Sequence, residues 1–219
     1  MGWLRDNWLR ALVHLGALAP LFFIVLDNYR YNLTANPIQE ITVRTGKAGL
    51  VLLVLSLACT PLNTIFGISQ AIRVRRALGL YGFMYVALHL AIFVALDYGG
   101  NLQLVGQAIV EKYYVIAGFV AFLILVPLAI TSTRGWMHRL GRSWKTLHRL
   151  VYLAVPIAVL HFALLVKSLG SRPEPLIFGA IVLGLLALRL PTVRRASSAL
   201  RLRLRNRSPL PSRGQVGAD

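Results

Sequence analysis

The stretch Trp144-Lys-Thr-Leu-His-Arg-Leu-Val-Tyr-Leu-Ala-Val-Pro-Ile-Ala-Val-Leu-His161 places two of the chain's five histidines at the two ends of one apolar run. The thirteen residues from His148 to His161 span about 20 Å on a helix, most of the hydrocarbon thickness of a bilayer. An imidazole in hydrocarbon leaves its N–H and its lone pair unsatisfied, so polar groups at this depth usually face the bundle interior and form a site. Two histidines on one span therefore indicate metal ligands, and haem iron suits histidines inside a helix bundle.

The composition is that of an integral membrane protein. Of the 219 residues, 57% are hydrophobic and only 14% are charged, and the mean hydropathy is +0.65. Aqueous globular domains carry more charge than this. The formal net charge of +17 would suit nucleic-acid binding, but the charges lie in short segments between apolar runs and in one tail, which argues against that function. Cys59 is the only cysteine, so neither a disulfide framework nor a thiolate metal site is indicated.

The apolar runs predict an all-α fold, a six-helix transmembrane bundle. The expected spans are residues 11–26, 46–62, 77–96, 113–130, 147–166 and 175–190. A short amphipathic surface helix is expected over 102–112, whereas the polar segment 27–44, the segment around Arg73 to Arg76 and the basic segment 135–145 are expected to be loops. The predicted organisation is an N-terminal segment (1–10), a membrane domain (11–190) and a basic tail (191–219), disordered beyond Arg207.

Six spans place both termini on one side, and the basic residues indicate which side that is. The termini, together with the connections between spans two and three and between spans four and five, hold 18 of the 24 Lys and Arg residues. The opposite side holds the other six and five of the seven acidic residues. The positive-inside rule therefore predicts a multi-pass membrane protein with cytoplasmic termini.

This orientation converts sequence position into depth. From the cytoplasmic side, His89 lies about 18 Å along span three and His161 about 21 Å along span five. The two histidines share a level, as the two axial ligands of one haem must. His89 could instead be a core histidine bonded to a neighbouring carbonyl, but its depth-matched partner favours ligation.

His148 lies at the cytoplasmic level, where a second haem could bind, but its partner is not obvious. The position thirteen residues before His89 is Arg76 rather than histidine. His14, early in span one, has a suitable depth to be a ligand, or could bond a haem propionate, a quinone or a backbone carbonyl. Arg75 and Arg76 are interpreted as a topology signal, with salt bridges to haem propionates as the alternative.

The directions of His148 and His161 raise a geometric question. Thirteen residues of ideal helix leave their rings roughly 140° apart around the axis. Either a kink at Pro156 corrects the difference, or the two histidines face different partners. His138, in the basic segment, is expected to be solvated.

Some signatures of other enzyme classes are absent from the sequence. No Gly-x-Gly-x-x-Gly follows a strand and no P-loop occurs, so electrons arriving from the cytoplasm must come from a quinone, a bound flavin or another protein. No Ser-His-Asp set lies at suitable depths and no His-Glu-x-x-His occurs, which argues against an intramembrane hydrolase.

Several motifs together are similar to those of one family. They are Thr45-Gly-Lys-Ala-Gly49, Cys59-Thr-Pro-Leu62, Arg75-Arg-Ala-Leu-Gly-Leu80 with Leu88-His89-Leu90, Thr131-Ser-Thr133, and Leu140-Gly-x-x-Trp-x-x-Leu-His148 followed by His161. Over about residues 10–190 the chain resembles the haem-binding membrane subunits of periplasmic methionine sulfoxide reductase systems, within the wider ferric-reductase-like transmembrane family. The resemblance implies a six-helix cytochrome of the bacterial inner membrane with one or two haems b. It would carry electrons from the membrane quinone pool, directly or through FMN, to a periplasmic molybdopterin-containing reductase subunit, on which catalysis takes place.

The haem histidines of the family carry over to His89, His148 and His161. Ferric reductases and NADPH oxidases have a second histidine on span three and a C-terminal flavin and nicotinamide domain, and neither is found in this sequence. The haem count therefore stays open, and a self-contained NADPH oxidoreductase is not expected. The alternative functions are a stand-alone ferric or superoxide-type transmembrane reductase and a haem-free transporter or structural membrane protein.

Overall fold

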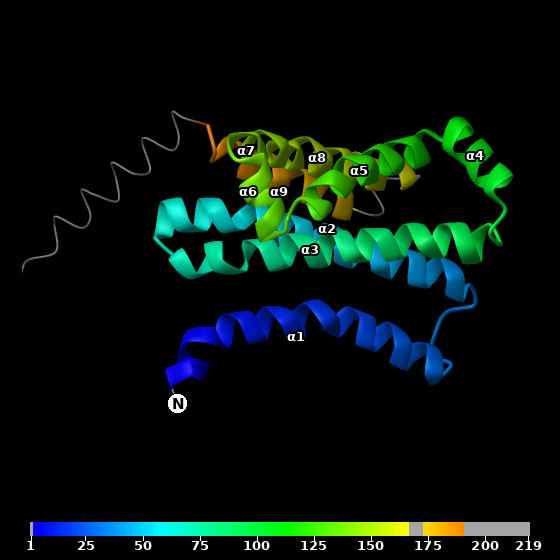
Figure 1. The fold of residues 1–219 in the computed structure, drawn as a ribbon. Coiled ribbons are helices and arrows are strands. Elements are labelled where there is room, and N and C mark those ends of the chain that lie inside the picture. Colours follow the sequence, from blue (N-terminus) through cyan, green and yellow to red (C-terminus); the bar gives the residue numbers. More distant parts are fainter. Residues whose placement is uncertain (1, 167–172, 191–219) are drawn as a thin grey trace, which may run out of the picture.

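The computed structural model describes residues 2–166 and 173–190, with side chains from residue 8 onward. Within these residues the regular structure is helical, and the long helices lie side by side in a bundle (Figure 1). Five helical segments are long and apolar enough to cross a membrane: Trp8–Tyr29, Pro37–Phe66, Ser69–Asp97, Tyr113–Ile130 and Arg142–Leu165. This confirms the predicted all-α, multi-pass membrane architecture.

The long helices are α1 (Gly2–Tyr29), α2 (Pro37–Phe66), α3 (Ser69–Ile92), α5 (Tyr113–Ile130) and α8 (Val151–Leu165). A π-helical turn, η1 (Phe93–Asp97), extends α3, and a 3-10 turn, η2 (His148–Leu150), precedes α8. The predicted sixth span corresponds to α9 (Glu174–Ala187), whose 14 residues rise about 21 Å, less than the roughly 30 Å of a hydrocarbon core. The count of six spans therefore stays a prediction. The predicted tail, 191–219, lies outside the described residues.

Three segments that were predicted to be loops are helical in whole or in part: of the predicted loop 27–44 only 30–36 is non-helical, and the other two segments lie mainly in helices. Pro37 begins α2, and the Asn36 side chain caps it by accepting a hydrogen bond from the Gln39 N–H at 3.1 Å. Arg73 to Arg76 lie within α3, and the basic segment forms α6 (Arg134–Leu140) and α7 (Arg142–Leu147). These predictions were wrong because charged residues mark where a helix leaves the hydrocarbon, not where it ends, and arginine is a good helix former. The predicted surface helix is confirmed as α4 (Leu102–Glu111).

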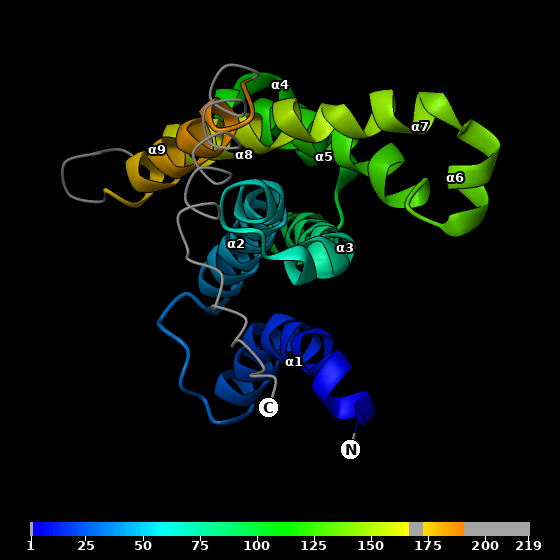
Figure 2. The same ribbon diagram turned by 90° about the vertical axis from the view of Figure 1, so that its left-hand side faces the viewer.

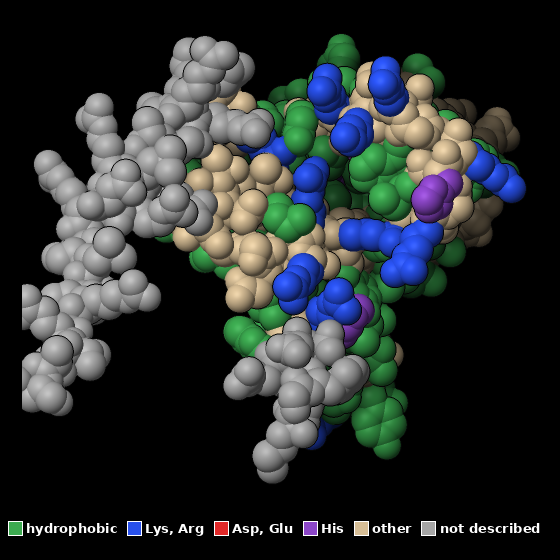
Figure 3. Space-filling view, turned by 60° about the vertical axis from the view of Figure 1, so that its left-hand side comes forward, with side chains coloured by type: hydrophobic (Ala, Val, Ile, Leu, Met, Phe, Trp, Pro, Cys, Tyr) green, Lys and Arg blue, Asp and Glu red, His purple; other side chains and the backbone are tan. Residues whose placement is uncertain are grey.

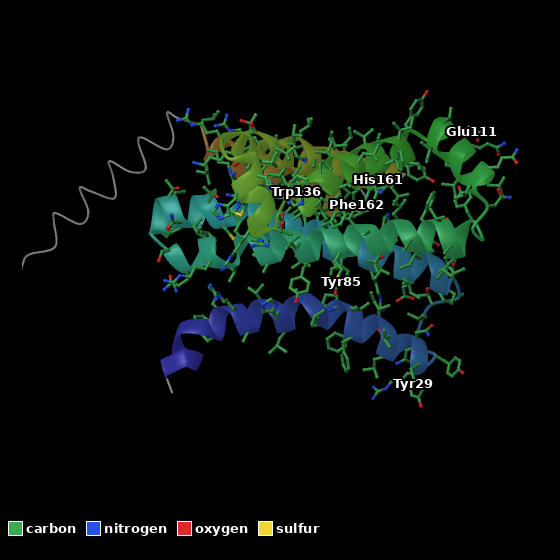
Figure 4. All side chains as sticks on the ribbon, in the orientation of Figure 1. Tyr29, Tyr85, Glu111, Trp136, His161 and Phe162 are labelled. Carbon is green, nitrogen blue, oxygen red and sulfur yellow. The ribbon has the colours of Figure 1, made fainter. Side chains whose placement is uncertain are left out.

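Helix α1 lies against the α2–α3 side of the bundle (Figure 2) and is joined to it by Tyr85. The fully buried Tyr85 hydroxyl donates to the Ala17 carbonyl at 2.7 Å and accepts from the Leu21 N–H at 3.0 Å. An unbroken helix would join these two backbone groups directly, and Pro20 between them supplies no N–H of its own. Tyr85 thus supplies hydrogen-bond partners to the backbone of α1 next to its proline and links α1 to α3. Figure 4 shows the Tyr85 side chain pointing from α3 toward α1.

Helices α2 and α3 approach closely because small residues line their contact. A Cβ on Gly82 would lie 2.9 Å from the Leu53 side chain, and one on Gly49 would lie 3.3 Å from the Gly82 carbonyl. The main apolar core joins this hairpin to α5, α8 and α9 through buried residues that include Leu53, Leu57, Leu125 and Val155. The bundle is therefore built from two helical hairpins, α2–α3 and α5–α8, packed together, with α1 outside them.

Candidate metal centre between α3 and α8

The structure brings His89 of α3 and His161 of α8 together in the bundle interior. Their ring centroids lie 6.0 Å apart with the ring planes at 81°, and Figure 4 shows His161 on the side of α8 that faces α3. A metal held between two imidazoles at bond lengths of about 2 Å separates the ring centroids by roughly 6 Å. The spacing of the two rings is therefore compatible with one metal between them.

Both imidazoles are held by a backbone carbonyl from the partner helix of their own hairpin. His89 Nδ1 lies 2.8 Å from the Thr42 carbonyl oxygen, and His161 Nδ1 lies 2.6 Å from that of Tyr114. A carbonyl oxygen only accepts, so Nδ1 carries the proton in both rings and Nε2 keeps its lone pair. Histidines that bind metals commonly have this arrangement, which fixes the ring and raises the basicity of the ligating nitrogen.

Two glycines make room for the rings. A Cβ on Gly46 would lie 3.0 Å from His89 Nδ1, and a Cβ on Gly118 would lie 2.7 Å from His161 Nδ1 and 2.9 Å from its Cε1. Any side chain at either position would push on the imidazole. These glycines, and the Thr42 and Tyr114 carbonyls, are site elements that the sequence analysis did not find.

The two half-sites repeat with one register. In each hairpin the carbonyl residue precedes the glycine by four positions, and the glycine precedes the histidine by forty-three: Thr42, Gly46 and His89 in one, Tyr114, Gly118 and His161 in the other. A search of the sequence for this repeated spacing would have found the glycines. The position that corresponds to His148 in the first hairpin is Arg76, seventy-two residues earlier.

His148 has different surroundings from the histidine pair. Its Nε2 lies 3.1 Å from the Thr131 hydroxyl, and its ring stacks on Trp144 with centroids 4.1 Å apart. The Trp144 indole N–H donates to the Thr131 carbonyl at 2.9 Å. Both rings reach α5, His161 at the Tyr114 carbonyl and His148 at the Thr131 hydroxyl that follows the helix, and only His161 also faces His89 of α3.

The remaining predicted site residues lie apart from the histidine pair. His14 Nδ1 is 2.8 Å from the Tyr81 hydroxyl, on the α1 side of α3. Arg76 and His138 are exposed. Arg75, not Arg76, turns inward, where it is half-buried and donates to the Thr60 hydroxyl at 3.3 Å.

The ligand set indicates which kind of metal group would fit. Among the residues that the structure describes, no three His, Cys, Asp or Glu side chains converge on a possible ion. A structural zinc site needs four protein ligands and a catalytic one three, whereas a porphyrin supplies four nitrogens itself and asks the protein for axial ligands only. Two histidines with free Nε2 atoms, each facing a glycine, fit a haem better than a bare ion.

Fold and site together define a multi-pass helical membrane protein with a two-histidine centre between its hairpins. The family model described as ferric reductase like transmembrane component matches residues 45–159, which include His89 and His148 and end two residues before His161. The chain therefore belongs to the ferric reductase-like transmembrane family and, by its curated relatives, to the MsrQ group within it.

Three such relatives illustrate the likeness, each named protein-methionine-sulfoxide reductase heme-binding subunit MsrQ. The Caulobacter vibrioides protein is 41% identical over 89% of this chain and 92% of its own length. The Xanthomonas euvesicatoria protein is 42% identical over 93% and 94%, and the Rhodospirillum rubrum protein is 43% identical over 89% and 93%. No solved structure matches the chain. The family resemblance inferred from the sequence motifs is confirmed.

Proposed function

We propose that this protein is a b-type cytochrome subunit of the bacterial inner membrane with six spans and cytoplasmic termini. It would carry electrons from the quinone pool, directly or through FMN, to a periplasmic molybdopterin-containing reductase that repairs methionine sulfoxide in oxidised proteins. The observation that supports this most directly is the His89–His161 pair. In both rings Nδ1 donates to a backbone carbonyl, so the lone pair of Nε2 is available to bind a metal. The names of the MsrQ relatives agree with it.

The residues of the chain would act by holding and tuning the group. A bound haem supplies one-electron chemistry, and the protein sets its potential through axial ligation, hydrogen bonding and burial. His89 and His161 would be the axial ligands, with their rings fixed by the Thr42 and Tyr114 carbonyls. Gly46 and Gly118 leave the rings room to take this position.

His148 is proposed as a ligand at the cytoplasmic level, where a second haem would bind. The corresponding position of the first hairpin holds Arg76, so this site would have no second histidine related by the repeat. We therefore expect a second haem, where bound, to differ in its spectrum from the one between His89 and His161. A redox titration of the purified protein, fitted for one or two components, tests this expectation.

The ligand assignment is tested by the visible spectrum of the detergent-purified protein. His89→Ala and His161→Ala should each abolish the Soret absorbance of the outer haem, while His138→Ala, which removes an exposed histidine on α6, should leave it intact. Full haem content in both His89→Ala and His161→Ala would refute the assignment. A colourless wild-type protein after expression with ample haem would refute the cytochrome function.

A second candidate function is a stand-alone ferric or superoxide-type reductase, which the description of the matching family model favours. The two functions differ in their electron acceptor. Co-purification with a molybdopterin reductase, and reoxidation of the reduced protein by that partner, would support the subunit function. Reoxidation by ferric chelates alone, at rates that the partner does not increase, would support the stand-alone reductase.

A further inference from the structure

The positive charge of the Arg189 side chain is only partly balanced by the groups around it. It follows α9 and reaches across to α2, where Nη2 donates to the Leu57 carbonyl at 2.5 Å. Its Cζ lies 4.6 Å from the centre of the Tyr152 ring on α8. Its Nε and Nη1 are buried and have no hydrogen-bond partner in the described part of the chain. Burying guanidinium N–H groups without an acceptor is unfavourable, so we expect an acceptor close to Nε and Nη1 of Arg189.

A second arginine lies within electrostatic reach of the first. The half-buried Arg75 of α3 donates to the Thr60 hydroxyl, and Thr60 lies three residues from Leu57, the acceptor of Arg189, on the same face of α2. Two guanidinium groups on one side of a helix bundle repel each other, and the repulsion is strongest where water is excluded. The pair therefore needs negative charge near it.

The described carboxylates do not supply that charge. They all belong to the opposite end of the bundle, where Asp27 and Glu40 pair with Arg44, and Glu174 pairs with Lys47; Asp97 and Glu111 flank α4 at that same end. The end that contains α6 and α7 instead gathers Lys and Arg side chains, with no acidic side chain visible on the face in Figure 3. Among the residues whose side chains the structure describes, no carboxylate is therefore left to balance Arg189 and Arg75.

Charge balance indicates the class of ligand. A carboxylate or a phosphodiester carries one negative charge and would balance one of the two arginines. A phosphate monoester carries about −1.5 to −2 near pH 7 and would balance both. Guanidinium N–H groups are also well suited to phosphate oxygens. We propose that Arg189 and Arg75 form a binding site for a phosphate monoester between α2, α3 and α8.

The monoester could come from three sources with the same chemistry: inorganic phosphate, a mononucleotide such as FMN, or the lipid phosphatidic acid. If the source is FMN, the inference gives the flavin of the proposed function a position. The site itself does not depend on haem ligation by His89 and His161. The Soret absorbance reports on that ligation separately, so the two proposals can fail independently.

The test is thermal unfolding of the purified full-length protein in phosphate-free detergent buffer, with each probe added in turn. A saturating monoester should raise the unfolding midpoint of the wild type by roughly 5 °C or more. FMN is compared with riboflavin, which lacks the phosphate, and phosphatidic acid with phosphatidylglycerol, a diester. A response to FMN but not to riboflavin identifies a mononucleotide, a response to phosphatidic acid but not to phosphatidylglycerol identifies a lipid, and a response to inorganic phosphate alone identifies the free anion.

Variants separate the site from general charge effects. Arg189→Gln and Arg75→Gln should lose the response, while Arg73→Gln, which removes an exposed arginine from the same helix, should keep it. If Arg189→Gln does not fold, Arg189→Lys should bind the effective probe at least tenfold more weakly. The inference is overturned if no probe shifts the wild type, or if the Arg189 variant that folds responds as Arg73→Gln does.

Discussion

Replacing Gly118 by alanine should damage the centre more than the same change at Gly46, and the structure gives the difference. An ordinary carbon–nitrogen contact is about 3.5 Å, whereas the added Cβ would lie 2.7 Å from His161 Nδ1 in one variant and 3.0 Å from His89 Nδ1 in the other. His161 must therefore move by about 0.8 Å and His89 by about 0.5 Å. Functional constellations tolerate misplacements of about 0.5 Å, so Gly118→Ala exceeds the tolerance and Gly46→Ala lies at its edge.

The energetic consequences follow from the same displacement. Overpacking a filled interior costs about 1–3 kcal/mol, and losing the hydrogen bond that orients a metal ligand weakens binding by about 10–100-fold. We expect Gly118→Ala to lose haem affinity near the upper end of that range and Gly46→Ala near the lower end. Replacing a helical glycine by alanine otherwise stabilises a helix by up to about 1 kcal/mol, so a loss of stability here would be due to the ring contact.

The assay is haem titration of the haem-depleted protein, followed by the Soret band, together with the unfolding midpoint of each variant. Gly179→Ala is the matched control, because its Cβ would lie 3.8 Å from Val159, an ordinary contact, on a helix of the same bundle. Gly179→Ala should bind haem like the wild type. If Gly118→Ala binds haem as tightly as this control, the close fit of the two rings has no functional role and the reasoning fails.

Three further predictions test other parts of the structure. Tyr85→Phe should destabilise the fold by about 1–3 kcal/mol, since it leaves the Ala17 carbonyl and the Leu21 N–H without their partner; an unchanged unfolding midpoint would show that α1 closes its own hydrogen bond. Arg44→Gln removes the ion pairs to Asp27 and Glu40, which are partly exposed, so it should lower stability by less than about 1 kcal/mol, and less at high salt than at low salt. Reporter fusions within the Arg134–Leu140 helix should be active only with a cytoplasmic reporter, and fusions at 31–35 only with a periplasmic one; the reverse pattern would invert the proposed orientation.

The sequence predicted the meeting of His89 and His161 because helical rise is nearly constant. Both spans are entered from the same side, so equal distances along two roughly parallel helices give equal depth, without any knowledge of packing. The same arithmetic could not say which side chain of an adjacent pair faces inward. Arg75 and Arg76 differ by about 100° around α3, and only the packing of α3 on α2 shows that Arg75 is the inward one.

Helix ends and hydrogen-bond partners were harder to predict. Segment 37–44 was assigned to a loop from its polarity, although Asn36-Pro37 is a typical cap and first residue of a helix. The carbonyls of Thr42 and Tyr114 carry no side-chain signal at all, since every residue has the same acceptor. Their role depends on how α2 packs against α3 and α5 against α8, which a residue pattern along one helix does not record.

The division of the centre between two hairpins also bears on biogenesis. The half of the chain that is translated first contains His89 with its glycine and its carbonyl, but it has nothing to oppose that ring. The pair exists only after translation has passed residue 161 and the later hairpin has docked on the earlier one. Haem binding between the hairpins would then distinguish completely inserted chains from incomplete ones. A chain whose second hairpin is missing or misplaced offers a single imidazole and would not bind haem at this site.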